Sequence, residues 1–272
     1  MTSINTNVGA LNARSSAVKA TTAMDKAMER LSSGLRVNSA SDDAAGLAVA
    51  GKMTSQLRGI NMSIRNAQDG VGLIQTAEAG ANEIQNMVLR IRELAVQMAN
   101  GIYEDTPDRA NAQLEVEALQ AQINLIAGYT RFNDINLLNG SFSAVDIQAG
   151  NTTSETIALT ISTMTTTGLS IHSASVSTQS NAKAAITTMD TALQTIATEQ
   201  ATLGSYINRM NFSIANLSKA SVMTEQAIGR VMDADFASET TNLSKQQILN
   251  QAATSMLAQA NQSKQSILAL LQ

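Results

Sequence analysis

One short stretch of the chain carries the glycine and lysine spacing of a phosphate-binding loop. Gly46, Gly51 and Lys52 fit the pattern G-x-x-x-x-G-K, in which backbone N–H groups cradle phosphates and the lysine reaches them. The pattern also needs a Ser or Thr directly after the lysine to ligate Mg²⁺, and this chain has Met53 there. Such a loop must follow a buried strand, whereas the preceding NSASDDAA is polar and small. We therefore interpret the stretch as the start of a long helix.

The other residues that are candidates for chemistry are few. Asp233, Asp235 and Glu239 suggest calcium ligands, but the central Gly and the final Glu of an EF-hand loop are absent, so a helix cap is the better interpretation. His172 is the only histidine and there is no cysteine, which excludes a multi-His or thiolate metal site within one chain. No nucleophile–base pair is present. We predict no catalytic, metal or cofactor site, and no enzyme activity.

The composition indicates an unusual interior and excludes several partners. The 272 residues include one proline, no tryptophan and only 3% aromatic residues, so few large side chains are available to fill a globular core. The net charge of −4 comes without clustered Lys and Arg, which argues against nucleic-acid binding. No apolar run approaches the length of a membrane span, so no membrane insertion is expected. The N-terminus also lacks the pattern of a cleaved secretory signal.

Small apolar residues recur at alternating spacings of three and four near both ends of the chain. This spacing places them along one side of a helix, and their small size lets a partner helix approach closely. The N-terminal seam consists of Ala10, Ala13, Ala17, Ala20, Met24, Ala27 and Leu31. The C-terminal seam consists of Leu249, Ala253, Met256, Ala260, Ile267 and Leu270. The first seam stops at the breaker cluster SSG, residues 32–34.

A much longer helix is predicted after this break. Ser41 is its expected N-cap, with Asp42 and Asp43 in its first turn, where carboxylates complement the helix dipole. A core-facing stripe then recurs every seven residues, at Met53, Ile60, Ala67, Ile74, Ala81, Val88 and Ala95. A helix over about 43–99 would be roughly 80 Å long. A further helix opens at Pro107, and a last long seam over 182–217 is interrupted by Gln200.

The middle of the chain has the only β signal. FSAVDIQAG and TIALTIS, joined by NTTSE, predict a β-hairpin at about 142–162. About half of residues 151–180 are Ser or Thr, so we expect a solvent-facing, variable loop at 163–180. The predicted fold class is mainly α: a long helical coiled-coil rod with a small β-hairpin insertion and paired N- and C-terminal helices. Narrow seams that leave other faces in need of neighbours favour a chain that polymerises head to tail.

Several long motifs, in order, resemble bacterial flagellin. They are INTNVGALNA at 4–13, RLSSGLRVNSASDDAAGLA at 30–48, RNAQDGVGLIQTAEA at 65–79, IRELAVQMANG at 91–101 and DADFASETTNLSKQQILNQAATSMLAQANQ at 233–262. The resemblance covers about residues 1–140 and 180–272. It implies an extracellular structural subunit that polymerises into the bacterial flagellar filament for swimming motility, in a short form lacking large outer domains. It also implies export through the flagellar type III channel.

The resemblance further implies two layers and several partners. An inner terminal-helix domain would comprise 1–40 with 230–272, and a middle domain would comprise 41–229. The two seams would form the inner layer of the homopolymer. A cytosolic export chaperone would hold the C-terminal helix, roughly 235–272, and the export apparatus, the cap and the hook-junction proteins would be further partners.

A last set of residues matches a middle-layer site that innate immune receptors recognise in some flagellins. Arg90, Leu94 and Glu115 match positions of that site, and they also serve contacts between subunits in the family. We hypothesise that the hairpin at 142–162 is a bistable element that sets the supercoil of the filament. Two alternatives stay open: a hook–filament junction protein, and a flagellin-like cell-surface binding protein or adhesin that uses the Ser/Thr-rich segment.

Overall fold

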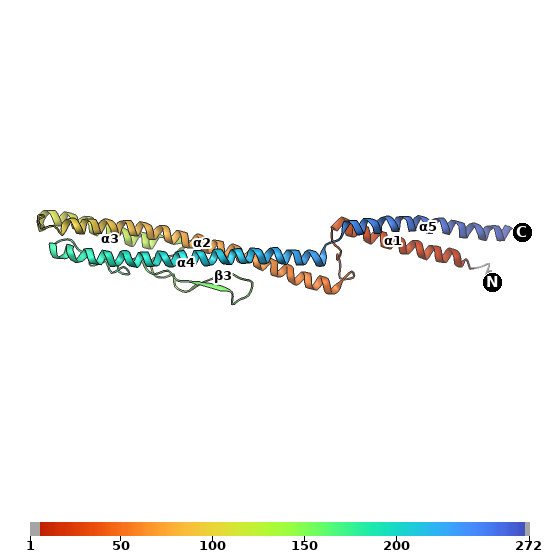
Figure 1. Cartoon of the computed structure of the whole chain (residues 1–272), viewed down its shortest axis with the longest axis horizontal. Coiled ribbons are helices and arrows are strands. Elements are labelled where there is room, and N and C mark those ends of the chain that lie inside the picture. The colour runs from red at the N-terminus through yellow and green to blue at the C-terminus, as the bar shows by residue number, and fades with distance from the viewer. Residues whose placement is uncertain (1–5, 270–272) are drawn as a thin grey trace. The chain divides into compact units, whose positions relative to one another are not determined.

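The chain is mainly α, as predicted (Figure 1). The computed structural model describes residues 6–269, with side chains described as far as Ser266. Its α-helices are α1 (Val8–Ser33), α2 (Ala44–Met98), α3 (Ala110–Tyr129), α4 (Gln179–Met232) and α5 (Phe236–Ala269). A short π-helical turn, η1 (Asp105–Arg109), precedes α3. The strands are β1 (Arg131–Phe132), β2 (Ile135–Asn136), β3 (Val145–Gln148) and β4 (Thr156–Leu159).

The helices are divided between two compact units. The terminal unit comprises Met1–Leu57 and Val222–Gln272, and the central unit comprises Arg58–Ser221. The division falls inside α2 and α4, whereas the breaks in the sequence pattern suggest boundaries at 40/41 and 229/230. By its contacts, α2 groups with the terminal unit as far as Leu57, and α4 does so from Val222 onward.

In the terminal unit, α1 and α5 lie side by side and run in opposite directions (Figure 1). The Asn7 side chain caps α1 by accepting a hydrogen bond from the Ala10 N–H at 3.0 Å. The helix ends at Gly34, whose φ of 72° is a left-handed conformation that glycine adopts without strain. This confirms the predicted break at 32–34. A short antiparallel bridge then pairs Leu35, in the connector between α1 and α2, with Asp233, in the connector between α4 and α5.

The start of α2 is not capped by Ser41, and that prediction is wrong. Asp43 takes the role: its Oδ1 accepts from the Gly46 N–H at 2.8 Å, because the helix begins one residue after Asp43. Asp42 turns back into the connector instead, and accepts from the Ser39 hydroxyl at 3.0 Å. The stretch that resembles a phosphate-binding loop is helical throughout, which confirms its interpretation as a helix start.

In the central unit, α2, α3 and α4 surround a continuous apolar core. The predicted stripe on α2 is buried at each residue from Ile60 to Ala95, and its residues from Ile74 onward belong to that core. On α4 the predicted interruption at Gln200 meets a matching polar site on α2. The Gln200 amide donates to Asn82 Oδ1 at 2.7 Å and to Gln85 Oε1 at 3.1 Å. A polar layer within an apolar seam favours one register of the two helices over its neighbours.

The predicted hairpin is present as the antiparallel pair β3–β4, with Ile147 opposite Ile157. The smaller pair β1–β2 was not predicted. Its two-residue turn, Asn133-Asp134, has φ of 48° and 61°, the positive values that a tight hairpin turn needs and that Asn and Asp tolerate. Strands of two residues are too short for an alternating pattern, so only this dipeptide signalled the turn.

The Ser/Thr-rich segment after β4 is not the solvent-facing loop that the composition suggested. Met164, Leu169, Ile171 and Val176 are buried in the core of the central unit. Side chains of α3 hold the intervening backbone. Gln120 donates to the Ile171 carbonyl at 2.8 Å. Asn124 accepts from the Thr166 N–H, and Gln113 accepts from the Val176 N–H. A few regularly placed apolar anchors therefore outweigh a polar average composition.

Candidate functional site

Three polar pairs fix the register of α1 against α5 in the terminal unit. The Asn7 amide donates to the Ala260 carbonyl at 3.0 Å, so this residue both caps α1 and ties it to α5. Asn250 Nδ2 donates to Thr21 Oγ1 at 2.8 Å. Near the other end, the Arg30 guanidinium lies 3.6 Å from Glu239. The pairs follow one antiparallel register along almost the whole of α1.

The two predicted seams meet across this register. Ala20, Ala27 and Ala253 are buried. The remaining seam residues of α1 are half-buried, as is Ala260: Ala10, Ala13, Ala17, Met24 and Leu31. Leu249 and Met256, in contrast, are 46% and 64% exposed. The side chain of Ile267 and the whole of Leu270 lie outside the described residues.

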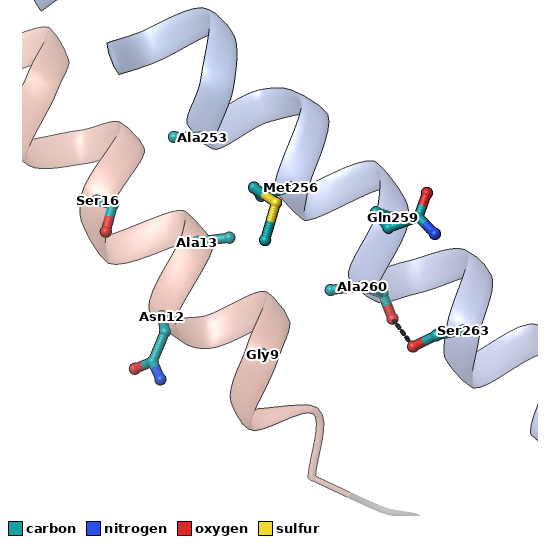
Figure 2. Close-up of a pocket in the computed structure, with 9 residues that line it drawn as sticks. All are labelled: Gly9, Asn12, Ala13, Ser16, Ala253, Met256, Gln259, Ala260 and Ser263. Carbon is teal, nitrogen blue, oxygen red and sulfur yellow. Dashed lines mark hydrogen bonds between the residues drawn. The ribbon is translucent and has the colours of Figure 1, made fainter.

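An open groove of about 470 Å³ separates the helices where the small residues face each other (Figure 2). Figure 2 shows Ala13 of α1 pointing toward Met256 of α5 across it. The lining residues are Gly9, Asn12, Ala13, Ser16, Ala253, Met256, Gln259, Ala260 and Ser263. None of them is a charged or nucleophilic group arranged for catalysis, so the groove is suited to packing against another apolar surface.

Several large apolar side chains of the same two helices are also exposed in the single chain. On α1 they are Val8, Leu11, Val18 and Met28, and on α5 they include Ile248, Leu249 and Met256. A pair of helices buries only one side of each member, and neither is stable alone in water. Exposed apolar side chains on both members of a helix pair favour an interface with another protein.

A second group of predicted site residues lies in the central unit. Arg90 Nε is 2.8 Å from Glu115 Oε1, so the structure brings these two exposed residues together. The hydrogen bond to Glu115, followed by one to Glu93, raises the pKa of Arg90. Leu94 does not share their surface: it is 4% exposed and belongs to the core.

A buried arginine that the sequence did not single out organises the turn after α2. Arg109 is 4% exposed and donates to three backbone carbonyls, those of Met98, Asn100 and Tyr103, at 2.6–2.9 Å. It also pairs with Asp105 at 2.7 Å. These carbonyls belong to the last turn of α2 and the loop after it, which lack partners inside a helix. No local pattern distinguishes such an arginine from a surface one.

The acidic residues that the sequence suggested as calcium ligands lie at the start of a helix. Asp235 Oδ1 accepts from the Ala237 N–H at 3.0 Å at the start of α5, which confirms the helix-cap interpretation. Within residues 6–269 no group of three or more His, Cys, Asp or Glu is placed to hold a metal ion. In the same range no helix has the length and apolar character of a membrane span.

Comparisons with known proteins match nearly the whole chain. The model of the bacterial flagellin N-terminal helical region matches residues 4–143, and that of the C-terminal helical region matches residues 186–271. The flagellar filament 33 kDa core protein of Treponema phagedenis is 39% identical over 98% of this chain and 99% of its own. A flagellin of Halalkalibacterium halodurans has the same identity and coverage. The crystal structure of Bacillus cereus flagellin is 32% identical, covers 56% of this chain and 88% of its own, and has a TM-score of 0.51.

Proposed function

The chain belongs to the bacterial flagellin family, and we propose that it is a structural subunit that polymerises into the extracellular flagellar filament. It is a short form, because only residues 144–185 lie between the two regions that the family models match, which leaves no room for a large outer domain. Its relatives are structural proteins rather than enzymes.

One observation of this chain supports the proposal most directly. The terminal unit pairs α1 with α5 in a fixed register, yet it leaves apolar side chains exposed on both helices, Met256 and Leu11 among them. A homopolymer covers such faces with further copies of the same helices, and a head-to-tail contact that does not close generates a helical filament. The inner terminal-helix domain, 1–40 with 230–272, would then form the inner layer and the domain at 41–229 the next layer.

Further partners belong to the same proposal. The apolar face of α5 would be covered by an export chaperone before assembly, and the chain would leave the cell through the flagellar type III channel. The export apparatus, the cap and the hook-junction proteins would be met on that route. Arg90 and Glu115 present a charged pair that an innate immune receptor would contact, with Leu94 supporting it from the core. A reporter-cell assay with purified monomer tests this last contact, and the absence of a response would contradict it.

Electron microscopy of purified protein tests the filament function. Short filament seeds and a salting-out salt are added to monomer, and the lengths of the products are measured. Long regular tubes are expected. Short caps on seed ends would favour a hook–filament junction protein instead, and persistent monomer would favour a cell-surface binding protein.

A further inference from the structure

A shallow groove in the central unit lies between α2 and the two small β-hairpins. It has a volume of about 340 Å³, and its apolar surface comes from Leu73, Phe132 and Ile147. Gly70 allows the close approach that shapes it. A Cβ added there would lie 2.8 Å from Met210 Cε, so the end of the Met210 side chain would have to move, and 3.4 Å from Ile147 Cγ2.

Two carboxylates line this groove beside the apolar surface. Asp69 comes from α2 and Asp146 from β3, and both residues are exposed. Among residues 6–269 neither carboxylate has an ion-pair partner. An apolar surface flanked by unpaired carboxylates fits the side chain of Arg or Lys, whose aliphatic stem packs on the apolar part while its charged head meets the carboxylates.

The same unit carries cations without partners. Two of its stretches contain no Asp or Glu at all: 58–68 and 200–221. Within them Arg58 and Lys219 are exposed, and neither forms an ion pair with any residue in the described part of the chain. The hydrogen bond from Ser221 to Asn61, 3.1 Å long, joins the two stretches and so places Arg58 and Lys219 at the same end of the central unit.

We propose that the groove at Asp69 and Asp146 binds Arg58 and Lys219 of a second copy of this chain. In its own copy Arg58 precedes Asp69 by eleven residues on one helix, about 16 Å along the axis, which is beyond the reach of its side chain. A neighbouring copy displaced along α2 brings the two surfaces together. The contact is head to tail, because two different surfaces of the chain meet. This proposal rests on the proposed filament function. The contact favours one axial displacement between neighbouring copies over others.

Charge reversal tests the contact. The groove variant Asp69→Lys with Asp146→Lys and the basic-end variant Arg58→Glu with Lys219→Glu are each compared with wild type in seeded elongation. The measured quantity is the monomer concentration left at steady state. Like charges facing each other across the contact raise it by at least about tenfold in either variant. The four changes combined in one chain restore complementarity and bring it back to within about threefold of wild type.

A matched control separates the specific contact from net charge. Glu83→Lys with Glu117→Lys, added to the basic-end variant, gives the same net charge as the fourfold variant but leaves the groove unchanged, so elongation is not rescued. Circular dichroism of each monomer checks folding. A groove variant that elongates like wild type, or a folded fourfold variant that elongates no better than the doubles, overturns the contact while the filament function stands. Wild-type protein that does not elongate overturns both.

Discussion

The terminal and central units are both built from long helices, yet they bury their side chains differently. In the central unit, residues from three helices, the β3–β4 hairpin and the Ser/Thr-rich segment meet in one core, where Ile74, Ile91 and Phe142 are almost fully buried. In the terminal unit, two helices meet along alanines and polar pairs, and Leu249 and Met256 remain exposed. The central unit therefore buries its large apolar side chains within one copy, whereas the α1–α5 pair leaves several of its own exposed.

The comparison predicts that substitutions in the two units act on different quantities. Ile91→Ala removes a fully buried side chain and is expected to lower the free energy of unfolding of the monomer by about 2–5 kcal/mol. Met256→Ala removes a side chain that is 64% exposed and should change it by less than about 0.5 kcal/mol. Urea unfolding of both monomers measures this difference.

Seeded elongation should show the opposite order, provided that it is measured at a temperature where the Ile91→Ala monomer stays folded: Met256→Ala impairs elongation more than Ile91→Ala does. Met256→Ala is expected to raise the steady-state monomer concentration, because its side chain is covered only in the polymer. Equal losses of monomer stability in the two variants would contradict the difference between the units.

The turn after α2 provides a second test of what stabilises the central unit. Arg109→Leu leaves three carbonyls without their donor and is expected to cost about 1–3 kcal/mol of monomer stability. Arg109→Lys should recover less than half of that loss, because an ammonium group cannot reach carbonyls in several directions as the planar guanidinium does. Thermal unfolding of the two variants measures both effects. If Arg109→Lys recovered the full monomer stability, the positive charge alone would stabilise the turn, rather than the several N–H donors of the guanidinium.

The sequence predicted the parts of the fold that repeat and missed those that depend on single contacts. The heptad stripe from Ile60 to Ala95 located α2 and its buried face, because a core-facing helix repeats its apolar residues. The cap of α2 moved from Ser41 to Asp43, since both residues are good caps and only the exact helix start decides between them. The burial of Arg109 has no periodic signal at all, because its partners are backbone carbonyls.

The candidate site shows the same division. Ala13 of α1 lines the same groove as Ala253, Met256 and Ala260 of α5, but the spacing does not tell how far Leu249 and Met256 stay exposed in one copy. Leu94 lies on a buried stripe of α2, while Arg90 lies on the exposed side, so a match to a surface site by sequence combined residues from two environments.

A smaller effect is expected where α1 depends on local contacts. Asn7→Ala removes both the cap of α1 and its tie to the Ala260 carbonyl, at a cost of about 1 kcal/mol to the helix end. Hydrogen exchange of amides 10–12 should accelerate about fivefold, while exchange in α2 of the central unit stays unchanged. Asn7→Ser, which keeps a cap but cannot reach as far, is the matched control. Acceleration throughout the chain would show that the two units unfold together.

The smallest expected effect is a pH dependence confined to the connector of the terminal unit. Hydrogen bonds from Ser39, and from the Asn38 N–H, lower the pKa of the Asp42 carboxyl. A lowered pKa means that Asp42 stabilises the connector above the ordinary carboxyl pKa of about 4, and that this contribution is lost as the pH falls through the lower value in the folded state. NMR of the Ser39 amide, followed from pH 6 to pH 2, should report the loss, and Asp42→Asn should abolish the transition. Asp42 lies within reach of water, and Lys26 beside it is mostly exposed. The change should therefore remain local and leave the amide chemical shifts of the central unit unchanged.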